Sequence, residues 1–190
     1  MRNDIVGWGG AIWGVLGVMG ILAYAIVGLL PLVLDALRDA LQWYHWVTLL
    51  VQVGLMAYAE GYRGFQRRFA PRVAARARYL IHHPQCYHAC VAPLFCMGFV
   101  YADWRLRLRI LLLASFIALV VLLVSRASQP WRGIIDAGVV VGLLWGVVSL
   151  SVLSIQAFTT VSFGYDAELP VTASQHTVSA PFNKSHTSAP

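Results

Sequence analysis

Five apolar stretches, separated by polar connections, organise the sequence. They cover approximately residues 9–34, 41–59, 86–102, 108–124 and 134–158. A helix needs about 20 apolar residues, with a range of about 17–25, to span the hydrocarbon core of a membrane. All five stretches reach at least the lower end of this range, although 86–102 and 108–124 only just do so. The pattern therefore predicts an all-α fold, a polytopic transmembrane helical bundle over residues 1–163.

The third stretch, 86–102, is the weakest candidate for a crossing. It is short, Pro93 interrupts it, and its first residues continue the polar sequence HHPQCYH. We expect it to be a re-entrant or interfacial segment, which leaves four crossings. A tilted or thinned bilayer accepts such a segment, so five crossings remain the alternative.

The distribution of arginine favours four crossings. Cytoplasmic loops of membrane proteins are enriched in arginine and lysine. With four crossings, the arginine-rich loop 61–85 and the arginines of 105–109 share the cytoplasmic side with both termini. Residues 164–190, rich in Ser, Thr, Ala and Pro, have little to bury, and we expect a disordered polar tail there.

The composition agrees with a membrane protein. Of 190 residues, 59% are hydrophobic and 12% are charged, whereas soluble domains carry about 25% charged residues. The net charge of +6 lies in the connections, so anionic lipid headgroups are the expected partner and nucleic acid is not. Five tryptophans mark the ends of stretches, as aromatic belts do. Trp13 and Trp145 lie deeper, and we expect them to pack between helices.

Glycine recurs at every fourth position in the first and the last stretch. The residues are Gly10 and Gly14, and the glycine ridge Gly138, Gly142 and Gly146. Small residues at this spacing let membrane helices approach closely. The ridges predict packing of the first helix on the last, or a face for a partner subunit or a second copy. Val140, off the ridge, should tolerate added bulk.

An arginine block interrupts the apolar pattern between the second and third stretches. It consists of Arg63, Arg67, Arg68, Arg72, Arg76 and Arg78. Pro71 can start a short amphipathic helix at the membrane interface within this block. Guanidinium groups bind phosphate or carboxylate through two hydrogen bonds. The block either sets topology alone, or binds an anionic lipid or an acidic patch of a partner.

A group of histidines and cysteines follows the block. Its members are His82, His83, Cys86, His88 and Cys90. Imidazole and thiolate groups suit zinc or copper, but the spacing does not match a paired CxxC or HxxxH site. Metal binding here is therefore the alternative to interfacial histidines and buried thiols. Two acids border the apolar stretches: we expect Asp136 to pair with Arg132, and Glu60 to pair with Arg63 or Arg67.

Motifs of catalysis are missing from the sequence. It contains no nucleophile elbow, P-loop, dinucleotide fingerprint, HExxH or paired catalytic carboxylates. We therefore predict no enzymatic activity and no cofactor. The favoured function is an accessory or scaffolding subunit of a membrane complex that contacts anionic lipids. The alternatives are a metal- or redox-handling membrane protein and, more weakly, a small oligomeric transporter.

Three segments resemble a family of small bacterial inner-membrane proteins with no assigned activity. The segments are AYAEGYRGFQRRFAPRVAARARYL, APLFCMGF and QPWRGIIDAGVVVGLLWG. The likeness covers most of residues 46–150. It implies a multi-pass protein of the bacterial inner membrane and carries no activity across.

Overall fold

The computed structural model describes residues 2–82, 91–98, 104–160 and 164–165, and within these parts helices joined by short turns are the regular secondary structure. The helices are α1 (Arg2–Arg38), α2 (Trp43–Met56), the π-helix η1 (Ala57–Phe69), α3 (Ala70–His82), α5 (Ala92–Met97), α6 (Trp104–Val124) and α7 (Trp131–Thr159). The all-α prediction is therefore confirmed. Residues 166–190, the predicted tail, lie outside the described residues.

Two of the described helices are long and apolar enough to cross a membrane. They cover Val6–Arg38 of α1 and Trp131–Thr159 of α7. By length and composition alone, the core helix of a soluble protein or an N-terminal signal sequence would look the same. The predicted apolar stretches 9–34 and 134–158 lie within these two helices.

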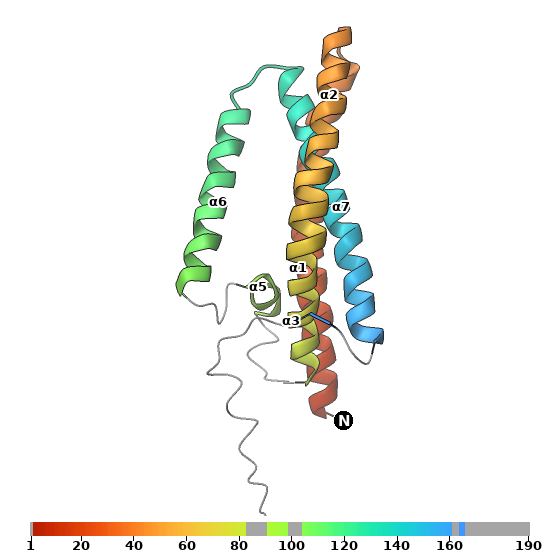
Figure 1. Ribbon diagram of the computed structural model, residues 1–190, viewed down its shortest axis with the longest axis vertical. Helices are drawn as coiled ribbons and strands as arrows, with labels where there is room; N and C mark the ends of the chain where they lie inside the picture. The colour runs from red at the N-terminus through yellow and green to blue at the C-terminus, as the bar shows by residue number, and fades with distance from the viewer. Residues whose placement is uncertain (1, 83–90, 99–103, 161–163, 166–190) are drawn as a thin grey trace, which may run out of the picture.

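The second stretch and the arginine block form one continuous rod, α2–η1–α3 (Figure 1). Both junctions keep right-handed helical backbone, with φ −70° and ψ −38° at Met56 and φ −61° and ψ −39° at Ala70. The expectation of a loop is therefore wrong over residues 61–69, whereas the short helix expected to start at Pro71 lies within α3. Gly61 and Gly64 lie inside the helix and do not bend the chain out of it.

The long rods alternate in direction along the bundle (Figure 1). α1 rises from the N-terminus, α2–η1–α3 returns, α6 rises again, and α7 ends beside the start of α1. α5 lies at this lower end, and α6 stands apart from the other helices in the view. Within the third stretch, the structure describes residues 91–98, and the helix among them is α5, which has six residues. At about 1.5 Å per residue it is only about 9 Å long, too short to cross a bilayer.

The main core lies in the lower half of the bundle, where α1, α3, α5 and α7 meet. Its buried members are Ala11, Val15, Val18, Ala70, Val73, Ala77, Leu80, Ala92, Phe95, Cys96 and Leu150. The small alanines of α3 allow this helix to lie close to α1 and α7, so that dispersion contacts accumulate along its length.

α7 is the central helix and is buried along two stripes. The glycine ridge packs on α2 and η1. The second stripe packs Ala137 and Val140 with Val33 of α1. Val140 is only 6% exposed, so the expectation that it tolerates bulk is not supported by its surroundings.

The outward faces of the rods are apolar. Tyr24 and Val27 of α1 are 83% and 68% exposed, and Leu50 of α2 is 72% exposed. On α6, Leu112, Val121 and Leu123 are also exposed. Trp13 is 56% exposed, so the expectation that it packs between helices is wrong.

Candidate functional site

The six arginines of the block fall into an outward group and an inward group. Arg63, Arg67 and Arg68 on η1 are exposed, as is Arg72 on α3. The inward group comprises Arg76, which is 3% exposed, and the half-buried Arg78. The η1–α3 segment therefore exposes the four outward arginines to the surroundings and packs the two inward arginines against other helices.

Arg76 fixes α5 against α3. Its Nη1 donates a hydrogen bond of 3.0 Å to the carbonyl oxygen of Phe95, and its guanidinium carbon lies 5.8 Å from the centre of the Phe95 ring. Nη1 also approaches Gly98, whose φ of 93° lies in the left-handed region that glycine tolerates. The arginine pattern alone predicts that Arg76 binds a lipid or a partner. Its burial corrects this prediction, because the side chain is enclosed by protein.

Arg78 caps the end of α7. Its Nη1 donates hydrogen bonds to the carbonyl oxygens of Ala157, at 3.2 Å, and Thr160, at 2.7 Å. The last carbonyls of a helix lack partners within the helix and carry partial negative charge. A guanidinium at this position therefore stabilises the end of α7 and ties it to α3, so Arg78 also acts inside the protein.

The π-helical winding of η1 gathers its arginines on one side. An α-helix turns about 100° per residue, which separates positions 63 and 68 by about 140°. A π-helix, with i→i+5 hydrogen bonds and roughly 4.4 residues per turn, separates them by only about 50°. Arg63 and Arg68 accordingly line one surface depression of about 180 Å³, together with Ala59 and Gly64.

The opposite side of η1 is held by close contacts with α7. A Cβ atom built on Gly61 would lie 2.9 Å from the Trp145 ring, and one built on Gly146 would lie 2.7 Å from the Phe65 ring. The Trp145 indole nitrogen donates a hydrogen bond of 2.9 Å to Oε1 of Gln66. These contacts fix the rotation of η1 about its axis and so fix the direction of the arginine face.

The outward arginines of η1 are not neutralised by acids of the described chain. Within the described residues, no carboxylate lies within ion-pair distance of Arg63, Arg67 or Arg68. The expected pairing of Glu60 with Arg63 or Arg67 is therefore not present. The Arg67 guanidinium instead lies 5.1 Å from the centre of the Tyr62 ring, which in turn stacks on Tyr58 at 6.1 Å.

The predicted glycine contacts have different partners from those expected. All five glycines, Gly10, Gly14, Gly138, Gly142 and Gly146, are buried. Gly14 faces α5, where a Cβ atom would lie 2.7 Å from Sγ of Cys96. The glycine ridge faces Gln52 and Met56 of α2 and Glu60 of η1. α1 and α7 do pack together, but Gly14 faces α5 and the glycine ridge faces α2 and η1.

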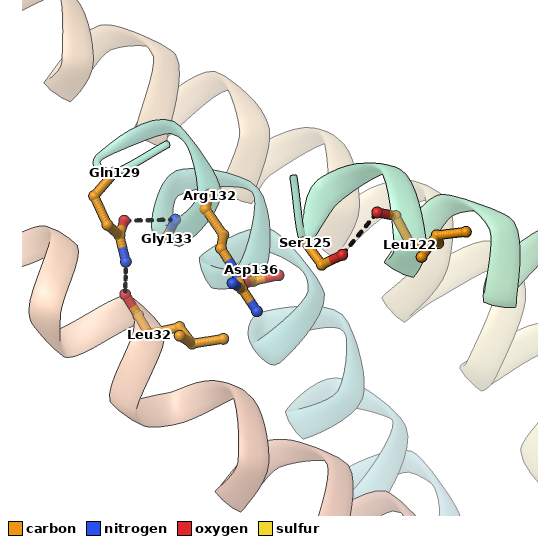
Figure 2. A network of polar contacts seen from close by, with 7 residues as sticks. All are labelled: Leu32, Leu122, Ser125, Gln129, Arg132, Gly133 and Asp136. Carbon is orange, nitrogen blue, oxygen red and sulfur yellow. Dashed lines mark hydrogen bonds and ion pairs between the residues drawn. The ribbon is translucent and has the colours of Figure 1, made fainter. Parts of the chain in front are cut away.

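The start of α7 carries a polar network (Figure 2). The Gln129 side chain donates to the carbonyl oxygen of Leu32 on α1 and accepts from the backbone N–H of Gly133, both at 3.2 Å. It therefore links the two helices and satisfies one free N–H of the first turn of α7. Arg132 and Asp136 form the predicted ion pair, with 3.8 Å between Nε and Oδ2.

The predicted metal ligands fall almost entirely outside the part of the chain that the structure describes. His83, Cys86, His88 and Cys90 lie outside the described residues, and only the backbone of His82 is described. Cys96 is a buried free cysteine. Burial raises the pKa of its thiol to about 12, against a smaller lowering by the positive charge of Arg76. Cys96 therefore stays protonated at neutral pH and is a poor nucleophile.

No protein-family model, curated protein or solved structure matches the chain.

Sequence reasoning missed three residues that the structure places at important contacts. Gly133 of α7 lies against Leu32 and Ala36 of α1, and a Cβ atom there would be 2.6 Å from the Leu32 carbonyl oxygen. Gln129 bridges the same helices, and Phe95 receives Arg76. Gly133 is five residues before Gly138, so a search for glycines four apart does not find it.

Proposed function

We propose that the chain is a non-catalytic, multi-pass protein of the bacterial inner membrane. In this proposal it is an accessory or scaffolding subunit of a membrane complex, held in place by arginine–lipid contacts. The supporting observation is the apolar outer surface of the long helices, exemplified by Tyr24, Val27 and Leu50. Monomeric soluble proteins rarely expose contiguous apolar surface on this scale, whereas lipid accepts it without cost.

The packing of α1 supports its retention as a membrane helix. Ala11 and Val18 are at most 1% exposed and belong to the main core, and Gly14 is in contact with α5. A signal sequence is removed and does not supply core residues to the mature protein. Loss of α1 would expose the alanine face of α3 and one stripe of α7.

The arrangement of the rods supports four crossings with residues 2 and 160 on one side. α1 begins and α7 ends at the same end of the bundle (Figure 1). That end also holds α3 with Arg72, Arg76 and Arg78. Because arginine is enriched on the cytoplasmic side, we assign this end to the cytoplasm.

Two measurements test the proposal. The full-length protein should stay in the membrane pellet after extraction with alkaline carbonate, since only integral proteins resist this treatment. A reporter fused after residue 165 should fluoresce as a cytoplasmic protein and show no alkaline phosphatase activity, whereas a phosphatase inserted between α6 and α7, at Ser128, should be active. Release by carbonate would reject membrane integration. An active phosphatase after residue 165 would reject four crossings.

A further inference from the structure

We propose that the depression on η1 between Arg63 and Arg68 binds the phosphate of an anionic phospholipid headgroup. This inference rests on the proposed membrane location and specifies the ligand and the residues that hold it. The site consists of Ala59, Arg63, Gly64 and Arg68.

The chemistry of the site suits a single phosphate. Two guanidinium groups line a hollow of about 180 Å³, smaller than the roughly 300–1,000 Å³ of pockets for drug-sized ligands. Guanidinium binds phosphate oxygens through paired, charge-assisted hydrogen bonds. Gly64 leaves the floor open: the nearest atom to a Cβ built there is the Ala59 carbonyl oxygen at 3.5 Å. The hollow therefore has donors on two sides and room for the anion between them.

The depth of the site fits the level of lipid phosphates. The outward side of α2–η1 begins with exposed Trp43 and continues with Leu50 and Leu55 to Tyr58 and Tyr62. From residue 43 to residue 62 the rod rises roughly 25–30 Å, at about 1.5 Å per α-helical residue and less in the π-helix. The hydrocarbon core of a bilayer is about 30 Å thick. With Trp43 and Trp131, which both contact Tyr44, at one interface, the tyrosines lie at the other, and the arginines follow immediately at headgroup level. α7 reaches this level at Trp145 and Gly146, so the rest of α7 and the lower end of α1 extend beyond the hydrocarbon on this side.

The aromatic neighbours also suit a lipid. Tyr58 and Tyr62 stack on each other, and Arg67 covers Tyr62. Tyrosine has an apolar ring and a polar tip, and it gathers at the boundary between hydrocarbon and headgroups. A phospholipid whose phosphate lies between Arg63 and Arg68 would extend its acyl chains past these rings toward Leu55, in the direction of the membrane centre.

The first test replaces the guanidinium groups without changing charge. The full-length protein and the variant Arg63→Lys/Arg68→Lys are reconstituted in nanodiscs of equal phosphatidylglycerol and phosphatidylcholine. Bound lipid is then counted by native mass spectrometry. We expect the variant to retain phosphatidylglycerol about tenfold less, because lysine is a point charge and lacks the paired donors. The matched control is Arg38→Lys/Arg126→Lys, exposed arginines outside η1, which should retain lipid as the wild type does.

The second test fills the hollow without touching its charge. A leucine at position 64 would enter the depression, so Gly64→Leu should lose phosphatidylglycerol to a similar extent. Gly54→Leu is the control, because a Cβ atom built on Gly54 would have nothing within 4 Å, and this residue faces outward on α2. Both substitutions exchange an exposed or half-exposed helical glycine for the same side chain, so a general effect of leucine would affect both.

Four outcomes would overturn the proposal, and each points elsewhere. Wild-type retention by the Arg63→Lys/Arg68→Lys variant would leave these arginines as topology signals. Displacement of the lipid by millimolar inorganic phosphate would indicate a site for the free ion. Loss of a co-purifying protein instead of lipid would indicate an acidic partner. Release of the protein by carbonate would remove the proposed function as well, whereas unchanged retention in an integral protein would remove this inference alone.

Discussion

Replacing Gly133 with alanine should destabilise the fold, although alanine is the better helix former. A Cβ atom at Gly133 would overlap Cβ of Ala36 and lie 2.6 Å from the carbonyl oxygen of Leu32. Attractive contacts between carbon atoms are about 3.5–4.0 Å long. Because one obstacle is backbone, no rotamer change can relieve it, and α7 must move away from α1.

The size of the effect follows from two opposing contributions. Alanine in place of glycine favours a helix by about 0.8–1.0 kcal/mol. Overpacking a tight contact costs about 1–3 kcal/mol, and contact with backbone favours the upper half of that range. We expect Gly133→Ala to lose about 1–2 kcal/mol. Gly20→Ala on α1, with nothing within 4 Å of its Cβ position, should gain about 0.5–1 kcal/mol.

Thermal denaturation in one mild detergent, followed by circular dichroism, measures the difference. For a chain of 150–250 residues, 1 kcal/mol shifts Tm by about 2–4 °C. The two variants should therefore differ by about 3–12 °C, with Gly133→Ala below the wild type and Gly20→Ala above it. Gly142→Ala should fall between them, because its nearest neighbours, at 3.2 Å, are side-chain atoms of Glu60. A Tm for Gly133→Ala equal to or above that of Gly20→Ala would refute the reasoning.

The remaining predictions concern buried groups of the lower core. Arg76→Met should lower Tm by several degrees, because it removes the bond to the Phe95 carbonyl that holds α5, at about 1.5–3 kcal/mol for a charged donor. The exposed Arg126→Met should change Tm by less than about 2 °C, and equal losses would contradict the role of Arg76. In a Cys86→Ser/Cys90→Ser background, Cys96 should resist maleimide at pH 8, because a pKa of about 12 leaves the thiol protonated. Labelling should become fast on unfolding, and rapid labelling of the folded protein would contradict the burial.

Much of the architecture could be predicted from the length and spacing of apolar stretches. α1 and α7 contain the first and last predicted stretches, because an uninterrupted apolar run has few alternatives to a helix. The ion pair of Arg132 and Asp136 followed from their spacing by one helical turn. These features depend on the local sequence alone.

Features that depend on the neighbouring helix could not be predicted. The polar segment 61–69 reads as a loop, yet it is helical and packs on α7, where Gly61 lies against Trp145 and Phe65 against Gly146. Trp145 contacts a second helix, as expected, through Gly61 and Gln66, but that helix is η1, which the sequence did not indicate. Spacing indicates which residues share a face, and the partner of that face is decided by tertiary packing.

The π-helical winding of η1 also rotates α3 about the axis of the rod relative to α2. At roughly 80° per residue instead of 100°, its 13 residues fall behind an α-helix by roughly two thirds of a turn. α3 enters the lower bundle with that offset, and the offset aims Ala70 and Ala77 at the main core. The same amino acids wound as an α-helix throughout would rotate that alanine face away from the core. The fit between the upper and lower halves of this protein therefore depends on an angle, the rotation that the hydrogen-bond register of η1 gives to α3.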